Sequence, residues 1–186
     1  MVIIMNTSYT TNRLILRLLE TKDTVNVLSF YNRNRDHFEP WEQKRSPNFY
    51  TYNYQYTSLA IEKELINTKK MLRFWIFLKK NSNLIIGSIN FYNITEGCFS
   101  NCQVGYKIDQ NYIGMGFTYE AIKFALKVLK KEYKLHRVEA RIMPSNIYSI
   151  KLIEKLGFSN EGLARSSIKI NGEWEDHFVY AYIEEG

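Results

Sequence analysis

The first recognisable strand is Arg13–Leu19 (RLILRLL), in which polar and apolar residues alternate as in a strand with one buried face. Later apolar and alternating runs predict a three-stranded antiparallel unit, a single strand and a C-terminal hairpin. Lys80–Asn83 (KNSN) is predicted as the turn between the first two strands of the unit, and Asn171-Gly172 is the dipeptide most typical of a tight hairpin. The predicted strands after the first are Arg73–Lys79, Leu84–Tyr92, Cys102–Ile108, His136–Ile142, Ser166–Ile170 and Glu173–Ile183.

Apolar residues at helical spacing predict four helices. The helix that begins near Phe117 has a broad apolar stripe, and Gly157 stands where a helix-terminating glycine is expected. The aromatic segment His37–Tyr54 contains Pro40 and Pro47 and is expected to be an irregular connection. The predicted helices are Thr21–Asn34, Tyr56–Met71, Phe117–Glu132 and Ser149–Leu156.

The order of these elements predicts an α/β (α+β) fold, with a mixed, mostly antiparallel sheet, helices on both faces and a C-terminal β-hairpin. It lacks the strict alternation of strands and helices that a doubly wound parallel fold requires. The chain has 186 residues, of which 45% are hydrophobic and 24% are charged, as in a globular domain with a proper core. We therefore expect a single domain over residues 1–186.

A turn that contains Gly114 and Gly116 joins the strand ending at Ile108 to the helix at Phe117. The first N–H groups of a helix lack partners within it, and the helix dipole adds partial positive charge there, so a phosphate is a natural ligand. A Walker loop is excluded because no Lys-Ser or Lys-Thr follows, and a dinucleotide fingerprint requires Gly or Ala where Tyr119 stands. These residues alone fit a phosphate-binding turn and an ordinary glycine turn equally well.

Eight segments, taken in order, resemble those of a known family. They are TNRLILR, HFEPWE, IGSINFYNI, VGYKID, GMGFTYEA, HRVEARIMPSN, SIKLIEKLGFSNEG and NGEWEDHFVY. From Asn12 to Ile183 the chain resembles the GNAT acetyltransferases, and within them the RimJ/RimL type, which acetylates the N-terminal amine of ribosomal proteins. The resemblance implies the GNAT fold with its splayed sheet and acetyl-CoA as the co-substrate.

The resemblance also implies where the cofactor binds. In GNAT enzymes the pantetheine arm lies in the splayed gap like an additional strand, here along Tyr106, Lys107 and Ile108, and the N–H of Tyr106 would stabilise the oxyanion. Only Gly116 matches the family's glycine pattern, and a polar residue of that pattern is replaced by Ile113, which predicts weaker CoA binding. The turn residues expected to hold the pyrophosphate are Ile113, Gly114, Met115, Gly116, Phe117 and Thr118.

Asn146 and Ser149 match the N-x-x-S of the RimJ/RimL branch, which implies that Asn146 hydrogen-bonds the pantetheine region. Ile153 occupies the position where many GNAT enzymes have a proton-donating tyrosine, so Ser149 becomes the candidate general acid, with a structural role at the helix start as the alternative. An N-terminal amine has a pKa of about 8, so a carboxylate with a water relay suffices as the base. The candidate bases are Glu42 and Glu96, with Glu139 as a third.

Several other side chains receive structural or accessory roles. Glu120, in the first turn of its helix, is assigned a dipole or structural role, and His177 a structural one. Trp41 and Trp174, together with the aromatic segment Phe49–Tyr56, are candidates for the walls of an acceptor channel, with ordinary packing as the alternative. The three histidines lack the spacing of metal ligands, so no metal is expected.

Charge and composition limit the classes of partner that the protein is expected to bind. The net charge is +6, without a basic stripe interleaved with aromatic residues, so we expect no direct nucleic-acid binding. No apolar run is long enough to cross a membrane, and Cys98 and Cys102 are predicted to be free thiols of a cytoplasmic protein. The predicted partners are acetyl-CoA and a peptide or protein N-terminus, as a monomer or a homodimer. A small amine acceptor and a non-catalytic acyl-CoA-binding module are the alternatives.

Overall fold

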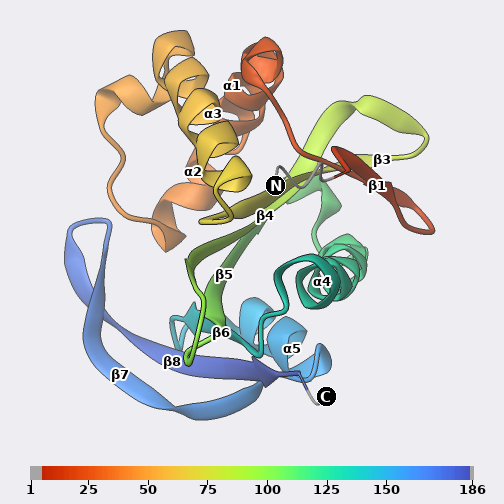
Figure 1. Ribbon diagram of the computed structural model, residues 1–186. Helices are drawn as coiled ribbons and strands as arrows, with labels where there is room; N and C mark the ends of the chain where they lie inside the picture. Colours follow the sequence, from red (N-terminus) through yellow and green to blue (C-terminus); the bar gives the residue numbers. More distant parts are fainter. Residues whose placement is uncertain (1–5, 185–186) are drawn as a thin grey trace.

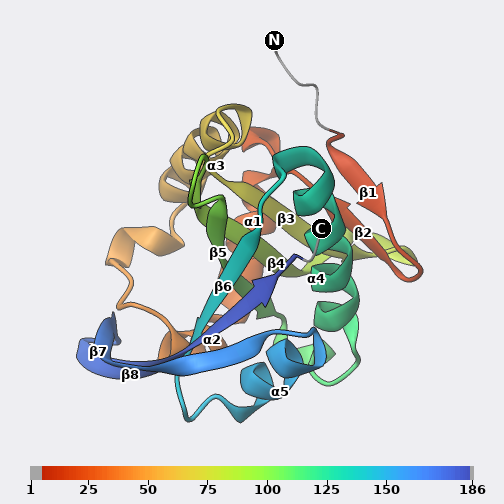
Figure 2. The same cartoon turned by 60° about the horizontal axis from the view of Figure 1, so that its bottom comes forward.

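A computed structural model describes residues 6–184 of the protein. Within these residues, eight strands form one sheet in the order β1-β2-β3-β4-β5-β6-β8-β7 (Figures 1 and 2). Neighbouring strands are antiparallel except β5 and β6, which are parallel. The strands are β1 (Ser8–Thr10), β2 (Leu14–Arg17), β3 (Leu72–Leu78), β4 (Asn81–Thr95), β5 (Asn101–Ile108), β6 (Arg137–Ile142), β7 (Ser159–Ile170) and β8 (Glu173–Ile183).

Helices cover both faces of the sheet, as predicted (Figure 1). The α-helices are α1 (Thr24–Arg33), α2 (Arg35–Phe38), α3 (Tyr52–Asn67), α4 (Phe117–Val128) and α5 (Ile147–Lys155). Four short 3-10 helices are η1 (Thr21–Asp23), η2 (Glu39–Trp41), η3 (Pro47–Tyr50) and η4 (Gln110–Tyr112), and a π-helical turn, η5 (Leu129–Tyr133), extends α4. None of the helices within residues 6–184 is long and apolar enough to span a lipid bilayer.

The alternation of side chains along β3 divides the core into two layers. Phe74 and Ile76 pack on the side of α4 and α5. Trp75 and Phe77 point the other way, into a layer made with α1 and α3. Because β3 is covered on both faces, nearly all of its side chains are buried, which explains why its sequence reads as an almost continuous apolar run.

The sheet opens between β5 and β6. These strands pair only at Asn101↔Arg137, Cys102↔Val138 and Gln103↔Glu139. Beyond Gln103, β5 continues to pair with β4 as far as Ile108, whereas β6 continues with β8. The β7–β8 hairpin then curves away from the rest of the sheet (Figures 1 and 2), and the result is the splayed, open mixed sheet that the sequence predicted.

Some predicted boundaries were wrong. Strand β1 was not predicted, and β4 begins at Asn81 instead of Leu84 because the turn consists of Lys79 and Lys80. Helix α3 begins at Tyr52 instead of Tyr56, since the hydroxyl of Thr51 caps it by accepting from the N–H of Tyr54 at 3.3 Å.

Two further segments differ from prediction for reasons that lie in the backbone. Strand β7 starts at Ser159 instead of Ser166, because irregularities after Asn160 and after Ala164 interrupt the two-residue alternation that marks a strand. The connection His37–Tyr54 is not wholly irregular, since it contains the second half of α2, all of η2 and η3, and the start of α3. The predicted Asn171-Gly172 hairpin turn is confirmed, with φ of +44° and +101°.

Candidate active site

The turn that leads into α4 has backbone angles that favour glycine. Gly114 has φ of +74° and Gly116 has φ of +76°, a region that side chains with a Cβ seldom adopt. Gly116 is the N-cap of α4, and no side chain caps the first helical N–H groups. The turn residues before Phe117 are exposed, so these amide donors and the positive end of the helix dipole are available to an anion from solvent.

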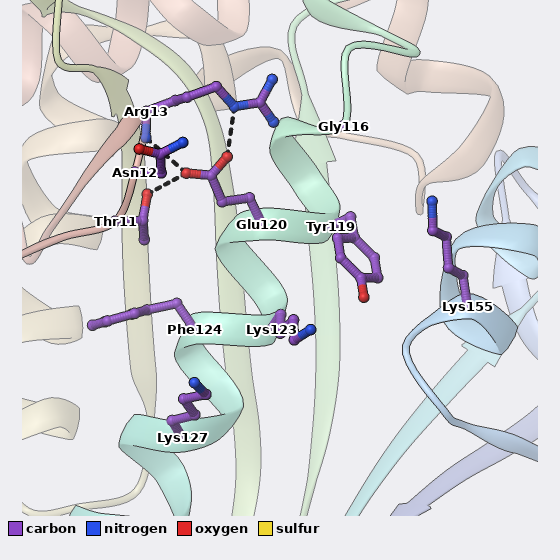
Figure 3. Close-up of a pocket in the computed structure, with 10 residues that line it drawn as sticks. All are labelled: Thr11, Asn12, Arg13, Gly116, Tyr119, Glu120, Lys123, Phe124, Lys127 and Lys155. Atoms are coloured by element: carbon purple, nitrogen blue, oxygen red, sulfur yellow. Dashed lines mark hydrogen bonds and ion pairs between the residues drawn. The ribbon is translucent and has the colours of Figure 1, made fainter.

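An ion pair between Arg13, just before β2, and Glu120 of α4 stabilises this turn (Figure 3). The carboxylate of Glu120 accepts from the hydroxyl of Thr11 at 2.6 Å, from the N–H of Arg13 at 2.8 Å and from Nε of Arg13 at 2.7 Å. Arg13 also donates to the carbonyl of Met115 at 3.0 Å and lies 4.4 Å from the ring centroid of Phe117. Burial opposes ionisation of Glu120, but these donors outweigh it and lower its pKa.

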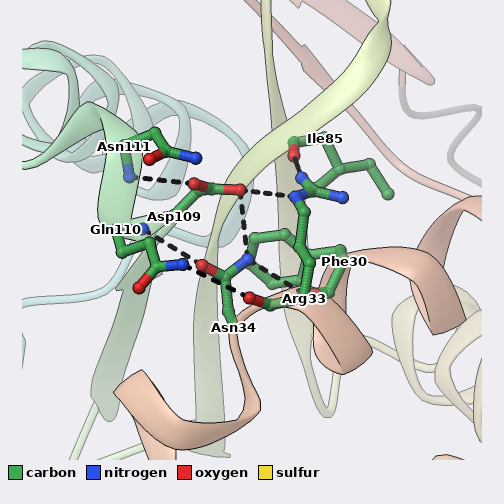
Figure 4. A network of polar contacts seen from close by, with 7 residues as sticks. All are labelled: Phe30, Arg33, Asn34, Ile85, Asp109, Gln110 and Asn111. Carbon is green, nitrogen blue, oxygen red and sulfur yellow. Dashed lines mark hydrogen bonds and ion pairs between the residues drawn. The ribbon is translucent and has the colours of Figure 1, made fainter.

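A second network holds the chain between β5 and α4 (Figure 4). The buried carboxylate of Asp109 accepts from Nε of Arg33 at 2.6 Å, from Nδ2 of Asn34 at 3.1 Å and from the N–H of Asn111 at 3.0 Å. Oδ1 of Asn34 also accepts a hydrogen bond from the N–H of Gln110 at 3.0 Å. Burial would raise the pKa of Asp109, yet these bonds lower it. The end of α1 therefore fixes the strand end from which the glycine turn departs.

The open edge of β5 presents backbone groups to the gap. The N–H of Asp109 donates to the carbonyl of Ile86 in β4 at 2.8 Å. Alternate residues of a strand direct their N–H and C=O groups to opposite sides, so those of Tyr106 and Ile108 face away from β4. The pairing of β5 with β6 ends at Gln103. An extended ligand could therefore add to this edge as a further strand.

Ser149 and Tyr106 meet on the α5 side of this gap. Asn146 is the N-cap of α5, and its Oδ1 accepts from the N–H of Ser149 at 3.1 Å. The hydroxyl of Tyr106 donates to the carbonyl of Ser149 at 3.3 Å, and burial raises the pKa of Tyr106 to about 12. Ile153, one turn further along α5, is fully buried in the core, so its apolar character has a packing role.

Glu42 and Lys107 meet on the opposite face, beside α2. Glu42 forms ion pairs with both Lys107 and Arg45. Burial opposes ionisation of Glu42, but the two cations prevail and lower its pKa. For Lys107, burial is the stronger influence and lowers the pKa. The carbonyl of Glu42 also accepts from the N–H of Asn171 at 2.9 Å, so the tip of the β7–β8 hairpin is attached at the same place.

The remaining candidates lie in different surroundings. Glu96 is exposed in the connection between β4 and β5, at the end of β5 that pairs with β6, and the structure does not bring it to the other candidates. Glu139 lies where the gap begins, but Arg137 pairs with it at 2.9 Å. His177 is buried, with Nδ1 3.0 Å from the carbonyl of Glu175, in keeping with the predicted structural role.

The cysteines are free, with Cys98 exposed and Cys102 buried. Burial raises the pKa of Cys102 to about 12, so its thiol is a poor nucleophile. Within residues 6–184 no group of three or more histidine, cysteine or acidic side chains could hold a metal ion.

Sequence reasoning overlooked the residues that support the site. Arg13 lies in the TNRLILR segment, Arg33 is next to the last residue of a predicted helix, and Asp109 directly follows a predicted strand. None of them carries a local signal for its partner, because Arg13 and Glu120 are 107 residues apart and Arg33 and Asp109 are 76 apart. Arg45, the second cation beside Glu42, is three residues away from it, and this spacing indicates a contact only within a helix, which the sequence does not predict there.

A strand with an open edge that leads into a helix N-terminus without a side-chain cap is the arrangement expected of a CoA-dependent acyltransferase. A model of the acetyltransferase (GNAT) domain family matches residues 13–159. The chain belongs to this family and is an acetyltransferase. Several solved structures with this fold contain CoA or acetyl-CoA, and acetyl-CoA is the co-substrate of the family.

Similar proteins point toward one branch of the family. The chain is 35% identical over 168 residues to the probable N-acetyltransferase YjcK of Bacillus subtilis, covering 90% of this chain and 92% of the relative. It is 34% identical over 173 residues to the ribosomal protein uS5 alanine N-acetyltransferase of Escherichia coli, covering 92% and 88%. The crystal structure of ribosomal-protein-S5-alanine acetyltransferase from Vibrio fischeri superposes with a TM-score of 0.92 at 33% identity, covering 97% and 98%.

Proposed function

We propose that the protein transfers the acetyl group of acetyl-CoA directly to the N-terminal α-amine of a protein, as the ribosomal-protein-alanine acetyltransferases do. The observation that carries this proposal is the similarity over nearly the whole chain to two enzymes of that name. The pairing of charges on the sheet face opposite α4 and α5, from which the acceptor would approach, also supports this proposal. Three carboxylates there, Glu42, Glu62 and Glu139, are each paired with arginine or lysine. A polyamine would need unpaired carboxylates there, so a polyamine is the less well supported form of the small-amine alternative.

In the proposed complex the pantetheine arm adds to the open edge of β5, where Tyr106 and Ile108 pair with its amides. The pyrophosphate is bound by the amides of residues 113–118. The N–H of Tyr106 then stabilises the oxyanion that forms when the amine nitrogen attacks the thioester carbon. When the C–S bond breaks, Ser149 supplies a proton to the departing thiolate, directly or through water.

In this scheme a weak base is sufficient to remove the proton from the acceptor amine. An N-terminal α-amine has a pKa of about 8, so an appreciable fraction is already neutral at pH 7. Glu42 has a lowered pKa because of Lys107 and Arg45, which weakens it as a proton acceptor. We assign it chiefly to holding the hairpin tip and η2 beside β5, with proton removal through water as its secondary role. The exposed Trp41 and Trp174 flank this junction in sequence and would contact the acceptor chain.

We assign the nucleotide end of CoA to a cavity of about 490 Å³ that is continuous with Gly116 (Figure 3). Lys123 and Lys155 lie 5.6 and 5.1 Å from the ring centroid of Tyr119, and Lys127 also lines the cavity. This cluster has the charge and the aromatic surface that a 3′-phosphorylated adenosine requires. Glu120 is the acidic residue of the lining and is already paired with Arg13.

This assignment predicts a preference for CoA over dephospho-CoA. Replacing Lys123 and Lys155 together by Ala should weaken CoA binding by about 3- to 10-fold, as expected for exposed charge pairs. The same double variant should bind dephospho-CoA as the wild type does, measured by calorimetry. Lys131→Ala, an exposed lysine beyond the cavity, is the control. Equal losses for both ligands would place the 3′-phosphate elsewhere.

The acceptor is tested with short peptides. Purified protein and acetyl-CoA should acetylate a peptide that begins with Ala or Ser, detected as thiol release and as a mass gain at the N-terminus. The same peptide with a blocked N-terminus and an internal lysine is the control. Acetylation of spermidine or a free amino acid at a higher kcat/KM than any peptide would overturn the proposed acceptor.

A further inference from the structure

Three residues lie in register across β3, β4 and β5. Arg73 pairs with Asn90, and Asn90 pairs with Gly105. The residues that flank Asn90, Ile89 and Phe91, belong to the core beneath α4 and α5, so Asn90 points to the opposite face, where α1 and α3 pack. Asn90 is only partly buried as a residue. The row therefore lies at the margin of that helical cover, beside the open edge of β5.

The side-chain oxygen of Asn90 is buried and makes no hydrogen bond to any residue within 6–184. Nε of Arg73 is in the same state, although Nη1 of Arg73 is held by Glu62 at 2.9 Å and Glu62 also accepts from Trp75 at 3.2 Å. A buried carbonyl oxygen without a donor lowers stability, so such a group calls for an explanation, and a donor supplied by a bound molecule is one.

Gly105 leaves space between Asn90 and the gap. A Cβ at this position would meet one side-chain atom within 4 Å, on Tyr92 at 3.7 Å, which is an ordinary contact. Its φ does not lie in the left-handed region, so the backbone does not require glycine. Gly105 therefore places no side chain of its own between Asn90 and the neighbouring Tyr106, whose N–H faces the gap.

We propose that Oδ1 of Asn90 binds the acceptor amine by accepting a hydrogen bond from one of its N–H groups, and that Gly105 keeps the path from this amine to the thioester open. This inference rests on the proposed function, in which an amine is the nucleophile. A neutral amide suits the task, because a carboxylate would stabilise the ammonium form, whose nitrogen has no lone pair to attack with.

Two variants test the proposal. Asn90→Leu removes the acceptor oxygen at similar volume, and Gly105→Ala narrows the path with a residue that the strand accommodates. For Asn90→Leu we expect kcat/KM for the amine to fall by about 10-fold or more, chiefly through KM, as for the loss of one hydrogen bond to substrate. For Gly105→Ala we expect a fall in the same direction, because the added methyl group obstructs the amine. The Kd for CoA should not change. The melting temperature of Asn90→Leu should stay the same or rise, and Asn83→Leu, an exposed position of the same strand, is the control.

The amine used is whichever one the wild type acetylates, peptide or small molecule, so a wrong choice of acceptor class does not affect the test. Unchanged kinetics in Asn90→Leu would overturn the inference and leave the proposed function intact. A lower melting temperature with unchanged KM would instead assign Asn90 to an internal contact with Arg73. If the wild type acetylated no amine at all, the proposed function and this inference would both fall.

Discussion

We expect Gly116→Asp to bind CoA at least about 100-fold more weakly than the wild type, a loss of about 2.8 kcal/mol. Gly116 is the N-cap of α4 at φ +76°, and its neighbours supply the amides assigned to the pyrophosphate. A carboxylate at this position would repel the phosphates, and two like charges about 4 Å apart near a protein surface oppose each other by about 4 kcal/mol. It could also cap the helix itself and occupy the donors that the ligand needs.

The variant Gly116→Asn separates the effect of charge on CoA binding from the effect of side-chain size. Asparagine has nearly the size of aspartate and tolerates the left-handed region better than most residues, so it introduces the same bulk without the charge. Calorimetric titration with CoA should show a clear loss for Asn and a much larger one for Asp. Both variants should lower the melting temperature by a similar few degrees, because each places a Cβ at φ +76° in an exposed position. Equal affinities for the two variants would contradict anion binding at this turn.

The sequence located the glycine turn because each of its signals is local. An apolar strand ends at Ile108, two glycines follow within eight residues, and the stripe of Ala121, Ile122 and Ala125 begins the next helix. Such patterns depend only on backbone geometry and on the period of the helix. The long resemblance supplied the splay of the sheet, which no periodicity predicts.

The supporting ion pairs could not be predicted in the same way. Glu120 carries a helix-dipole signal, yet its partner Arg13 comes from β2, and the Glu42–Lys107 pair joins η2 to β5. A charged residue has no preference for one distant opposite charge over another until the fold brings them together. For the same reason Glu42 looked like a free carboxylate in the sequence, whereas two cations neutralise it in the structure.

Ser149→Ala should lower kcat by about 10- to 1,000-fold with little change in the Kd for acetyl-CoA. The structural reason for expecting a selective effect is that the contacts of Ser149 to its surroundings use its backbone. Its N–H donates to Asn146 at 3.1 Å and its carbonyl accepts from Tyr106 at 3.3 Å. Alanine retains both contacts, so the cap of α5 and the position of Tyr106 should persist, and only the hydroxyl proton is lost.

Ser149→Thr is the matched variant, because it restores a hydroxyl at the same position, and it should recover much of the lost kcat. Ser145→Ala, an exposed serine just before α5, controls for a general effect on the helix start. Steady-state kinetics with a saturating peptide separate kcat from KM, and the melting temperature reports on the cap. If Ser149→Ala kept the wild-type kcat, the thiolate would take its proton from solvent, and Ser149 would have only a backbone role. The buried Ile153 could not replace it, since an aliphatic side chain has no proton to give.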